Sequence, residues 1–231
     1  MLPFSLLVRR HRVLPEIRLS LAALALAFCS QAMAQGEGGC GSLENHYGPF
    51  DYRKASQDRR NLVEKFHFTP GVESLTKKES TYFGGDLTYT LRVFPNHPRA
   101  LLTIQRLAER EKTDHPSNAE FSVSCFFDRA IRFQPEDTMV RMLYAQYLYK
   151  RQRTDEATKQ LDEVIQLAKD EPFTHFNVGL IFLDMKNYDR ALIQAHRAAE
   201  LGFPRTELKD GLAAVGKWRE PSPTATASPK P

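Results

Sequence analysis

Residues 138–171, TMVRMLYAQYLYKRQRTDEATKQLDEVIQLAKDE, and residues 172–205, PFTHFNVGLIFLDMKNYDRALIQAHRAAELGFPR, align with each other without a gap. Small residues recur at matching places, as Ala145 and Gly179 do, and a large apolar residue follows three positions later in each block. Self-similarity over 34 residues predicts a solenoid of stacked helix hairpins. One hairpin cannot bury its apolar face alone, so neighbouring hairpins must supply the core.

The two blocks resemble the tetratricopeptide repeat (TPR). This resemblance implies an all-α fold, a TPR-like helical-hairpin solenoid of about three and a half repeats. Two further stretches, Cys40 to Arg53 and GGDLTYTLRVFPNHPRALLTIQRL (84–107), resemble exported bacterial TPR proteins, which implies one integrated domain but no activity. We expect a signal peptide at 1–34, an aromatic-rich N-terminal segment at 35–69, a degenerate repeat at 70–97, repeats at 98–137, 138–171 and 172–205, a capping helix at 206–216 and a disordered tail at 217–231.

Local signals place several helix ends in the N-terminal part. Ser56 has the side chain of an N-cap and precedes a run that ends near Phe66 with apolar residues on one side. Thr69-Pro70 predicts a short helix, because proline is tolerated at the first helical position. We expect Gly84-Gly85 to break this segment and Asp86 to cap the next helix.

The repeat expected at 98–137 departs from the TPR pattern in two respects. Gln105 stands where a small residue is usual, and the unit is 40 residues long. The additional residues fall around EKTDHPSN (111–118), where Pro116 and Asn118 mark a loop. A tight contact between helices is therefore not predicted at Gln105.

The C-terminal part predicts one more helix and a tail. Thr206 has the side chain of an N-cap, and Leu208, Leu212 and Val215 fall at i, i+4 and i+7 on one face. Such a helix would cover the last apolar surface of the solenoid. The tail ends in PSPTATASPKP (221–231), which lacks bulky apolar residues and is expected to be disordered.

Residues 1–34 have the three parts of a signal peptide. Arginines precede a short apolar run, and Ala32-Met33-Ala34 provides a cleavage site with the cut after Ala34. The run is about half as long as a membrane-spanning helix requires, so no membrane span is expected after cleavage. Arg9-Arg10 could belong to a twin-arginine signal, and Cys29 could be a site of lipidation. We favour the general secretory route, which leads to a periplasmic or secreted location.

The leader also carries most of the excess positive charge. The chain has 32 Lys and Arg against 28 Asp and Glu, a net charge of +4, and the leader holds four Arg and one Glu. The rest of the chain is therefore close to neutral. Because it has no dense basic block with interleaved aromatic residues, nucleic-acid binding is not expected.

Two cysteines, Cys40 and Cys125, remain after removal of the leader. In an oxidising compartment such a pair usually forms a disulfide, which here would tie the N-terminal segment to the solenoid. The alternative is that Cys125, beside Phe126 on a predicted helix, is a buried free thiol.

In TPR solenoids the first helix of each repeat lines a concave groove in which partners commonly bind. The resemblance therefore implies a groove here, with candidates at helical spacings of three and four residues. Its surface grades from basic to apolar, so we expect an extended segment with an acidic and a hydrophobic end, from another exported or envelope protein. The candidates are Leu102, Arg106, Arg110, Met142, Gln146, Tyr149, Phe173, Phe176, Asn177 and Leu180.

Other readings of this surface stay open. The protein's own HYGPFDY segment (46–52) can cover it, or its apolar groups can pack between repeats. The alternative function is a small-molecule or glycan site between that segment and the groove, using Arg53 and Arg106.

Some cytoplasmic TPR proteins hold the terminal carboxylates of a chaperone with Lys and Asn on these helices. Leu102, Met142 and Gln146 stand at the places where such donors are needed, so that partner is not expected.

Catalytic and metal-binding motifs are missing from the sequence. It contains no nucleophile elbow, no phosphate-binding glycine loop and no HExxH. The histidines beyond the leader form no i, i+4 pair, and the cysteines form no CxxC. We therefore expect a non-catalytic scaffold without metal or cofactor. These histidines are His46, His67, His97, His115, His175 and His196.

Overall fold

The computed structural model describes residues 39–221, so the expected signal peptide and the end of the expected tail lie outside the described residues. Every described helix lies within residues 40–221. Within residues 39–221 there are ten α-helices and no strand. They are α2 (Gln57–His67), α3 (Pro70–Glu73), α4 (Phe83–Val93), α5 (Pro98–Glu111), α6 (Val123–Phe133), α7 (Thr138–Lys150), α8 (Thr154–Ala168), α9 (Pro172–Asp184), α10 (Tyr188–Glu200) and α11 (Glu207–Ala214).

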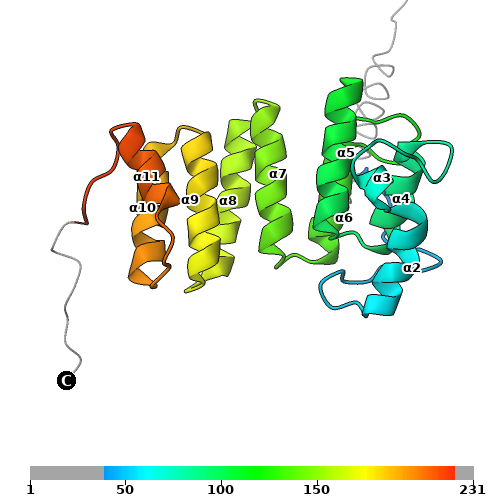
Figure 1. The fold of residues 1–231 in the computed structure, drawn as a ribbon, viewed down its shortest axis with the longest axis horizontal. Helices are drawn as coiled ribbons and strands as arrows, with labels where there is room; N and C mark the ends of the chain where they lie inside the picture. Colours follow the sequence, from blue (N-terminus) through cyan, green and yellow to red (C-terminus); the bar gives the residue numbers. More distant parts are fainter. Residues whose placement is uncertain (1–38, 222–231) are drawn as a thin grey trace, which may run out of the picture. The chain divides into compact units, whose positions relative to one another are not determined.

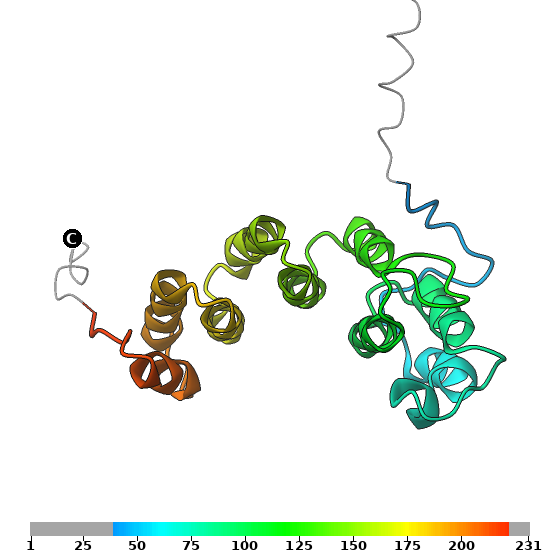
Figure 2. The same cartoon turned by 90° about the horizontal axis from the view of Figure 1, so that it is seen from above.

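The regular blocks form helix hairpins (Figure 1). Helix α7 packs most extensively on α8, and α9 on α10. Seen from above, α5, α7 and α9 lie along one side of the row of helices, and α6, α8 and α10 lie along the other (Figure 2). Ala145 and Gly179 are buried within the hairpins, where small side chains let the helices approach closely. The expected all-α, TPR-like solenoid is confirmed.

Two apolar clusters hold these elements together. The larger runs from Phe68, just after α2, to Leu212 in α11 and supplies the common core of the stacked hairpins. The smaller lies at the N-terminal end, where Tyr47, Phe50 and Tyr52 pack on it. Its buried residues are Ala55, Val63, Val93 and Phe94.

The predicted N-cap at Ser56 is confirmed, and Thr69 caps the short helix predicted at Pro70. The Ser56 hydroxyl accepts the backbone N–H of Arg59 at the start of α2, and that of Thr69 accepts the N–H of Val72 at the start of α3. Each satisfies a backbone donor that has no partner within its helix.

The predicted break at Gly84-Gly85 is wrong, because both glycines lie inside the first turn of α4. A Cβ atom at position 84 would lie 2.2 Å from the carbonyl oxygen of Ser117, so this glycine permits close approach of the loop before α6. Asp86 is likewise not a cap of a later helix. Its carboxylate accepts the backbone N–H groups of Glu79 and Ser80, at 3.0 and 3.1 Å, and so fixes the segment that enters α4.

Gln105 joins two repeats by a hydrogen bond where a small residue would allow tighter packing. Its side-chain amide is buried and donates to the carbonyl oxygen of Leu143 in α7, at 3.3 Å. The expected loop after α5 is present, and it is attached to α7 because the Tyr147 hydroxyl donates to Asp114 at 2.9 Å.

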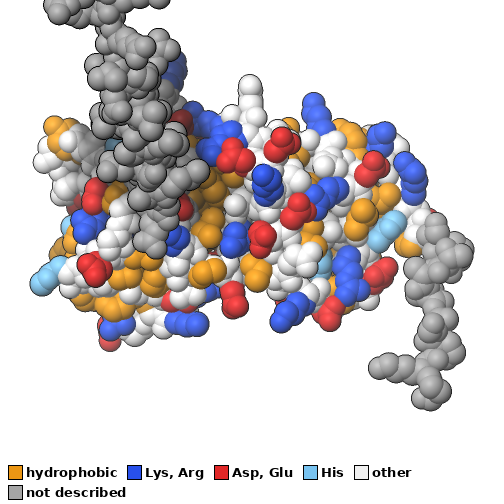
Figure 3. Space-filling view, turned by 180° about the vertical axis from the view of Figure 1, so that it is seen from behind, with side chains coloured by type: hydrophobic (Ala, Val, Ile, Leu, Met, Phe, Trp, Pro, Cys, Tyr) orange, Lys and Arg blue, Asp and Glu red, His pale blue; other side chains and the backbone are white. Residues whose placement is uncertain are grey.

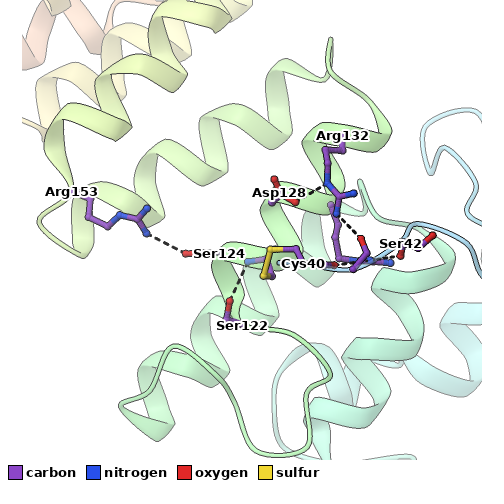
Figure 4. The surroundings of a disulfide bond; sticks show 10 residues. Cys40, Ser42, Ser122, Ser124, Asp128, Arg132 and Arg153 are labelled. Atoms are coloured by element: carbon purple, nitrogen blue, oxygen red, sulfur yellow. Dashed lines mark hydrogen bonds and ion pairs between the residues drawn. A yellow bond between two sulfur atoms is a disulfide. The ribbon is translucent and has the colours of Figure 1, made fainter. Parts of the chain in front are cut away.

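A disulfide joins Cys40 to Cys125 in α6, with their Cα atoms 5.0 Å apart. Beside it, the Arg129 guanidinium is buried and donates to the carbonyl oxygens of Cys40 and Ser42. Arg132 donates to the carbonyl oxygen of Gly41 at 2.9 Å (Figure 4). The sulfur bridge and the two arginines together hold the start of the described chain on α6.

Helix α11 covers the last hairpin with Leu208 and Leu212, which are buried. Val215 is exposed, contrary to the predicted apolar face, because the helix ends at Ala214. The Thr206 hydroxyl donates to the Asp210 carboxylate and does not cap the helix. Trp218 packs edge-on against His196, with ring centroids 5.0 Å apart, so the ordered chain extends past the expected start of the tail at 217.

Candidate partner-binding groove

Two adjoining hollows lie on the side of the solenoid formed by α5, α7 and α9, and together we call them the groove. They enclose about 310 and 270 Å³ and share Gln146, Ile181 and Asp184. The first is also lined by Leu102, Gln105, Tyr149 and Lys150, and the second by Met139, Met142, Leu143, Asn177 and Leu180.

The groove follows from the helical period and the 34-residue repeat. Residues three and four apart share a helix face, so Met142, Gln146 and Tyr149 present one stripe of α7. Asn177, Leu180 and Asp184 present the corresponding stripe of α9. A mostly apolar hollow with a few polar groups is the usual form of a binding site.

Six of the ten candidates expected from the sequence line the groove. They are Leu102, Met142, Gln146, Tyr149, Asn177 and Leu180. The structure adds Gln105, Met139, Leu143, Lys150, Ile181 and Asp184. Of these, Lys150 and Asp184 each lie four residues beyond an expected member, so helical spacing alone was sufficient to find them.

Arg106 and Arg110 do not line the groove. The Arg106 guanidinium donates to the carbonyl oxygen of Glu73 at 2.8 Å, and that of Arg110 to the carbonyl oxygen of Leu75 at 2.9 Å. The two side chains therefore fasten the turn after α3 onto α5, and the expected basic end of the groove is occupied with holding the fold.

Phe173 and Phe176 lie against the turn after α10. Only 2% of Phe176 is exposed, and the centroids of its ring and of the Phe203 ring lie 4.7 Å apart. Phe173 is exposed but lies 6.0 Å from Phe203, outside the groove lining. Both side chains belong to the end of the solenoid, where α11 takes the place of a further repeat.

The polar groups of the groove differ in how far they are satisfied. The Lys150 ammonium lies 3.0 Å from the Glu109 carboxylate, whereas Asp184 forms no ion pair within residues 39–221. The Asn177 amide donates to the carbonyl oxygen of Phe173, at 2.8 Å. In the same range the Gln146 side chain makes no hydrogen bond, so its donors and acceptor point to solvent or to a ligand.

The aromatic N-terminal segment packs elsewhere. Tyr52 stacks on His97, with ring centroids 3.9 Å apart, and Phe50 faces Phe94. No residue of HYGPFDY lines either hollow, which argues against occupation of the groove by this segment.

The residues expected for a small-molecule or glycan site have other partners. Arg53 contacts the carboxylates of Asp51 and Asp137, at 3.1 and 3.3 Å. Arg106 is engaged at the end of α3, as described above, so the two guanidinium groups do not converge on one pocket.

Titratable groups are perturbed at the N-terminal end. The Tyr52 hydroxyl donates to Glu64 at 2.7 Å, and burial together with this carboxylate raises the pKa of Tyr52 to about 12. Burial lowers the pKa of His97, which lies beside both. These groups connect the aromatic segment to α2 and α5 and are not part of the groove.

Within residues 39–221, His, Cys, Asp and Glu side chains nowhere gather in groups of three or more that could hold a metal ion. The described helices are all too short or too polar to cross a membrane.

Comparison with known proteins gives one local likeness. Over 44 residues, 19% of the chain, it is 39% identical to a Plasmodium falciparum (isolate 3D7) protein named Hsp70-Hsp90 organising protein. The chain spans about 8% of the length of that curated relative. No protein-family model matches the chain.

Proposed function

We propose that the chain is an exported, non-catalytic scaffold that binds an extended segment of another protein in the groove. The observation that carries the proposal is the groove itself. It joins three repeats along α5, α7 and α9, presents partly exposed Leu102, Met139 and Tyr149, and offers the unbonded Gln146 amide. Adaptable apolar side chains beside amide groups suit an extended peptide, whose backbone requires hydrogen bonds.

Export is supported by the signal-peptide pattern of residues 1–34 and by the disulfide between Cys40 and Cys125. Structural disulfides persist mainly in oxidising compartments. We accordingly propose a periplasmic or secreted location, and a domain organisation with repeats at 70–97, 98–137, 138–171 and 172–205.

The partner is proposed to differ from those of the Plasmodium falciparum protein, whose name refers to Hsp70 and Hsp90. Leu102, Met142 and Gln146 line the groove here. Two apolar side chains and a neutral amide offer no cationic donor for a terminal carboxylate.

A pair of variants tests the proposal. Replacing Tyr149 and Leu180 together by Ala should abolish capture of the partner from an envelope extract, with helical content unchanged in circular dichroism. The control is Ile193→Ala on α10, a residue that is 61% exposed and lies outside the groove. Equal recovery of the same partner by the double variant and the control would overturn the assignment of the groove.

A further inference from the structure

The charge of the groove differs from the sequence prediction. Arg106 and Arg110 donate to the backbone carbonyl oxygens of Glu73 and Leu75, and Arg99 pairs with the Glu73 carboxylate. The three arginines of α5 are thus all turned to the segment around α3. An acidic partner would find none of them in the groove lining.

The remaining charges of the groove leave a negative excess. Lys150, the one basic residue of the lining, is paired with Glu109. Asp184 is exposed, borders both hollows and has no ion pair within the described chain. A carboxylate at the mouth of an apolar hollow attracts a cation, because the low-dielectric wall weakens screening by water.

Apolar side chains line both of the hollows that Asp184 borders. Leu102 borders the first hollow and is 38% exposed as a residue, and Met139 borders the second and is 40% exposed. A bound segment would therefore place apolar residues in the two hollows and a cationic residue beside Asp184, which borders both.

The face of α8 and α10 does not show this arrangement. Acidic and basic side chains alternate over it (Figure 3). Arg190 pairs with Asp162 there, and Arg197 with Asp170. Some carboxylates of that face, such as Asp162 and Asp170, are thus paired, and neither apolar hollow of the groove extends to it.

We infer that the groove selects an extended protein segment in which a lysine or arginine is flanked by apolar residues, with the cationic group beside Asp184. This inference rests on the proposed function and assigns the chemistry of its partner.

The test uses the full chain and an array of immobilised nine-residue peptides. Each has Leu at two positions and Lys, Gln or Glu between them, together with scrambled versions that separate the three residues. Lys peptides should bind about two- to tenfold more tightly than Gln peptides, the range of a partly exposed ion pair, and Glu peptides should bind least. The preference should shrink in high salt.

Asp184→Asn should abolish the preference for Lys over Gln and keep the binding of Gln peptides. Glu163→Gln, which removes a carboxylate from the exposed face of α8, should keep the preference.

Equal binding of Lys and Glu peptides would overturn the charge inference and leave the groove assignment intact. Failure of every peptide to exceed its scrambled version would instead count against the proposed function. A dimer in sedimentation that Tyr149→Ala disrupts would make a second copy of the chain the occupant and overturn the inference.

Discussion

His97 is the clearest case of a single side chain that holds several elements. It is fully buried, and its Nδ1 accepts the backbone N–H of Ala100 at 3.3 Å, which caps α5. The ring proton therefore belongs on Nε2, which faces the Glu64 carboxylate at 3.4 Å. A second proton on Nδ1 would remove the cap, and burial also disfavours the charged ring, so the pKa of His97 lies below its ordinary value.

The lowered pKa of His97 predicts a loss of stability in mild acid. The unfolded chain takes up a proton near pH 6.5, the ordinary value, while the folded chain does so only at lower pH. The free energy of unfolding should therefore fall as the pH drops below about 6.5, towards the pKa of the folded state. His97→Asn retains a capping oxygen but does not titrate, so urea denaturation between pH 7.5 and 5.5 should show a weaker pH dependence.

His46→Asn is the matched control, because His46 is exposed and makes no hydrogen bond within residues 39–221. It should keep the pH dependence of the unmodified protein. If the free energy of unfolding changes with pH equally in the unmodified protein and in His97→Asn, the His97 ring does not set this pH dependence. Glu64, whose pKa is lowered by its contacts with His97 and Tyr52, loses its contribution at lower pH, on approach to 4.5.

At the scale of elements, helix α4 depends on a glycine that permits close packing. A Cβ atom on Gly84 would lie 2.2 Å from the Ser117 oxygen and 2.6 Å from the Ala119 nitrogen, both backbone atoms that cannot turn aside. Gly84→Ala should therefore lower the free energy of unfolding by about 1–3 kcal/mol, the usual cost of overpacking. Urea denaturation measures the difference.

Gly85 provides the control in the same turn. Its nearest neighbour to an added Cβ atom is the Ser80 hydroxyl, at 3.5 Å, which is ordinary contact. Gly85→Ala should be neutral or stabilise the protein by up to about 1 kcal/mol, because alanine favours the helix over glycine. Equal losses in both variants would contradict the packing argument.

The regular hairpins were predictable and the N-terminal elements were less so, for a physical reason. The pairs α7–α8 and α9–α10 depend on local periodicity, which the repeated small residues Ala145 and Gly179 display. Gly84 instead is required by close packing against the backbone of a loop more than thirty positions later in the chain. A contact of that kind leaves no local pattern, and a glycine pair by itself predicts a break in a helix.

At the scale of the molecule, the disulfide should contribute much of the stability of the N-terminal part. It closes a loop with a sequence separation of 85 between Cys40 and Cys125. By the loop-entropy model such a link stabilises the fold by about 4–5 kcal/mol. Replacing both cysteines by Ser should lower the free energy of unfolding towards that limit, measured in urea against the oxidised protein. Two alkylatable thiols in the native, oxidised protein would contradict the bridge.

The composition of the groove was predictable in part. Helical spacing and the TPR resemblance were enough for members such as Met142, Gln146 and Leu180, because a face of a helix follows from the sequence. The charge was not predictable in this way. Arg106 and Arg110 donate to backbone carbonyl oxygens of a turn that is distant in the sequence. Every residue has a backbone carbonyl oxygen, so the sequence does not indicate which one will accept such a hydrogen bond.

Position-resolved crosslinking tests the central claim, that a protein partner binds along α5, α7 and α9. A photoreactive amino acid is placed at Gln146 or Asn177 in the groove, or at Glu163 or Ile193 on the outer helices, and the full chain is irradiated in envelope extract. We predict that one partner is joined to both groove positions, through a single short segment identified by mass spectrometry, and to neither outer position. Crosslinks confined to the outer positions, or none at the groove, would contradict the account.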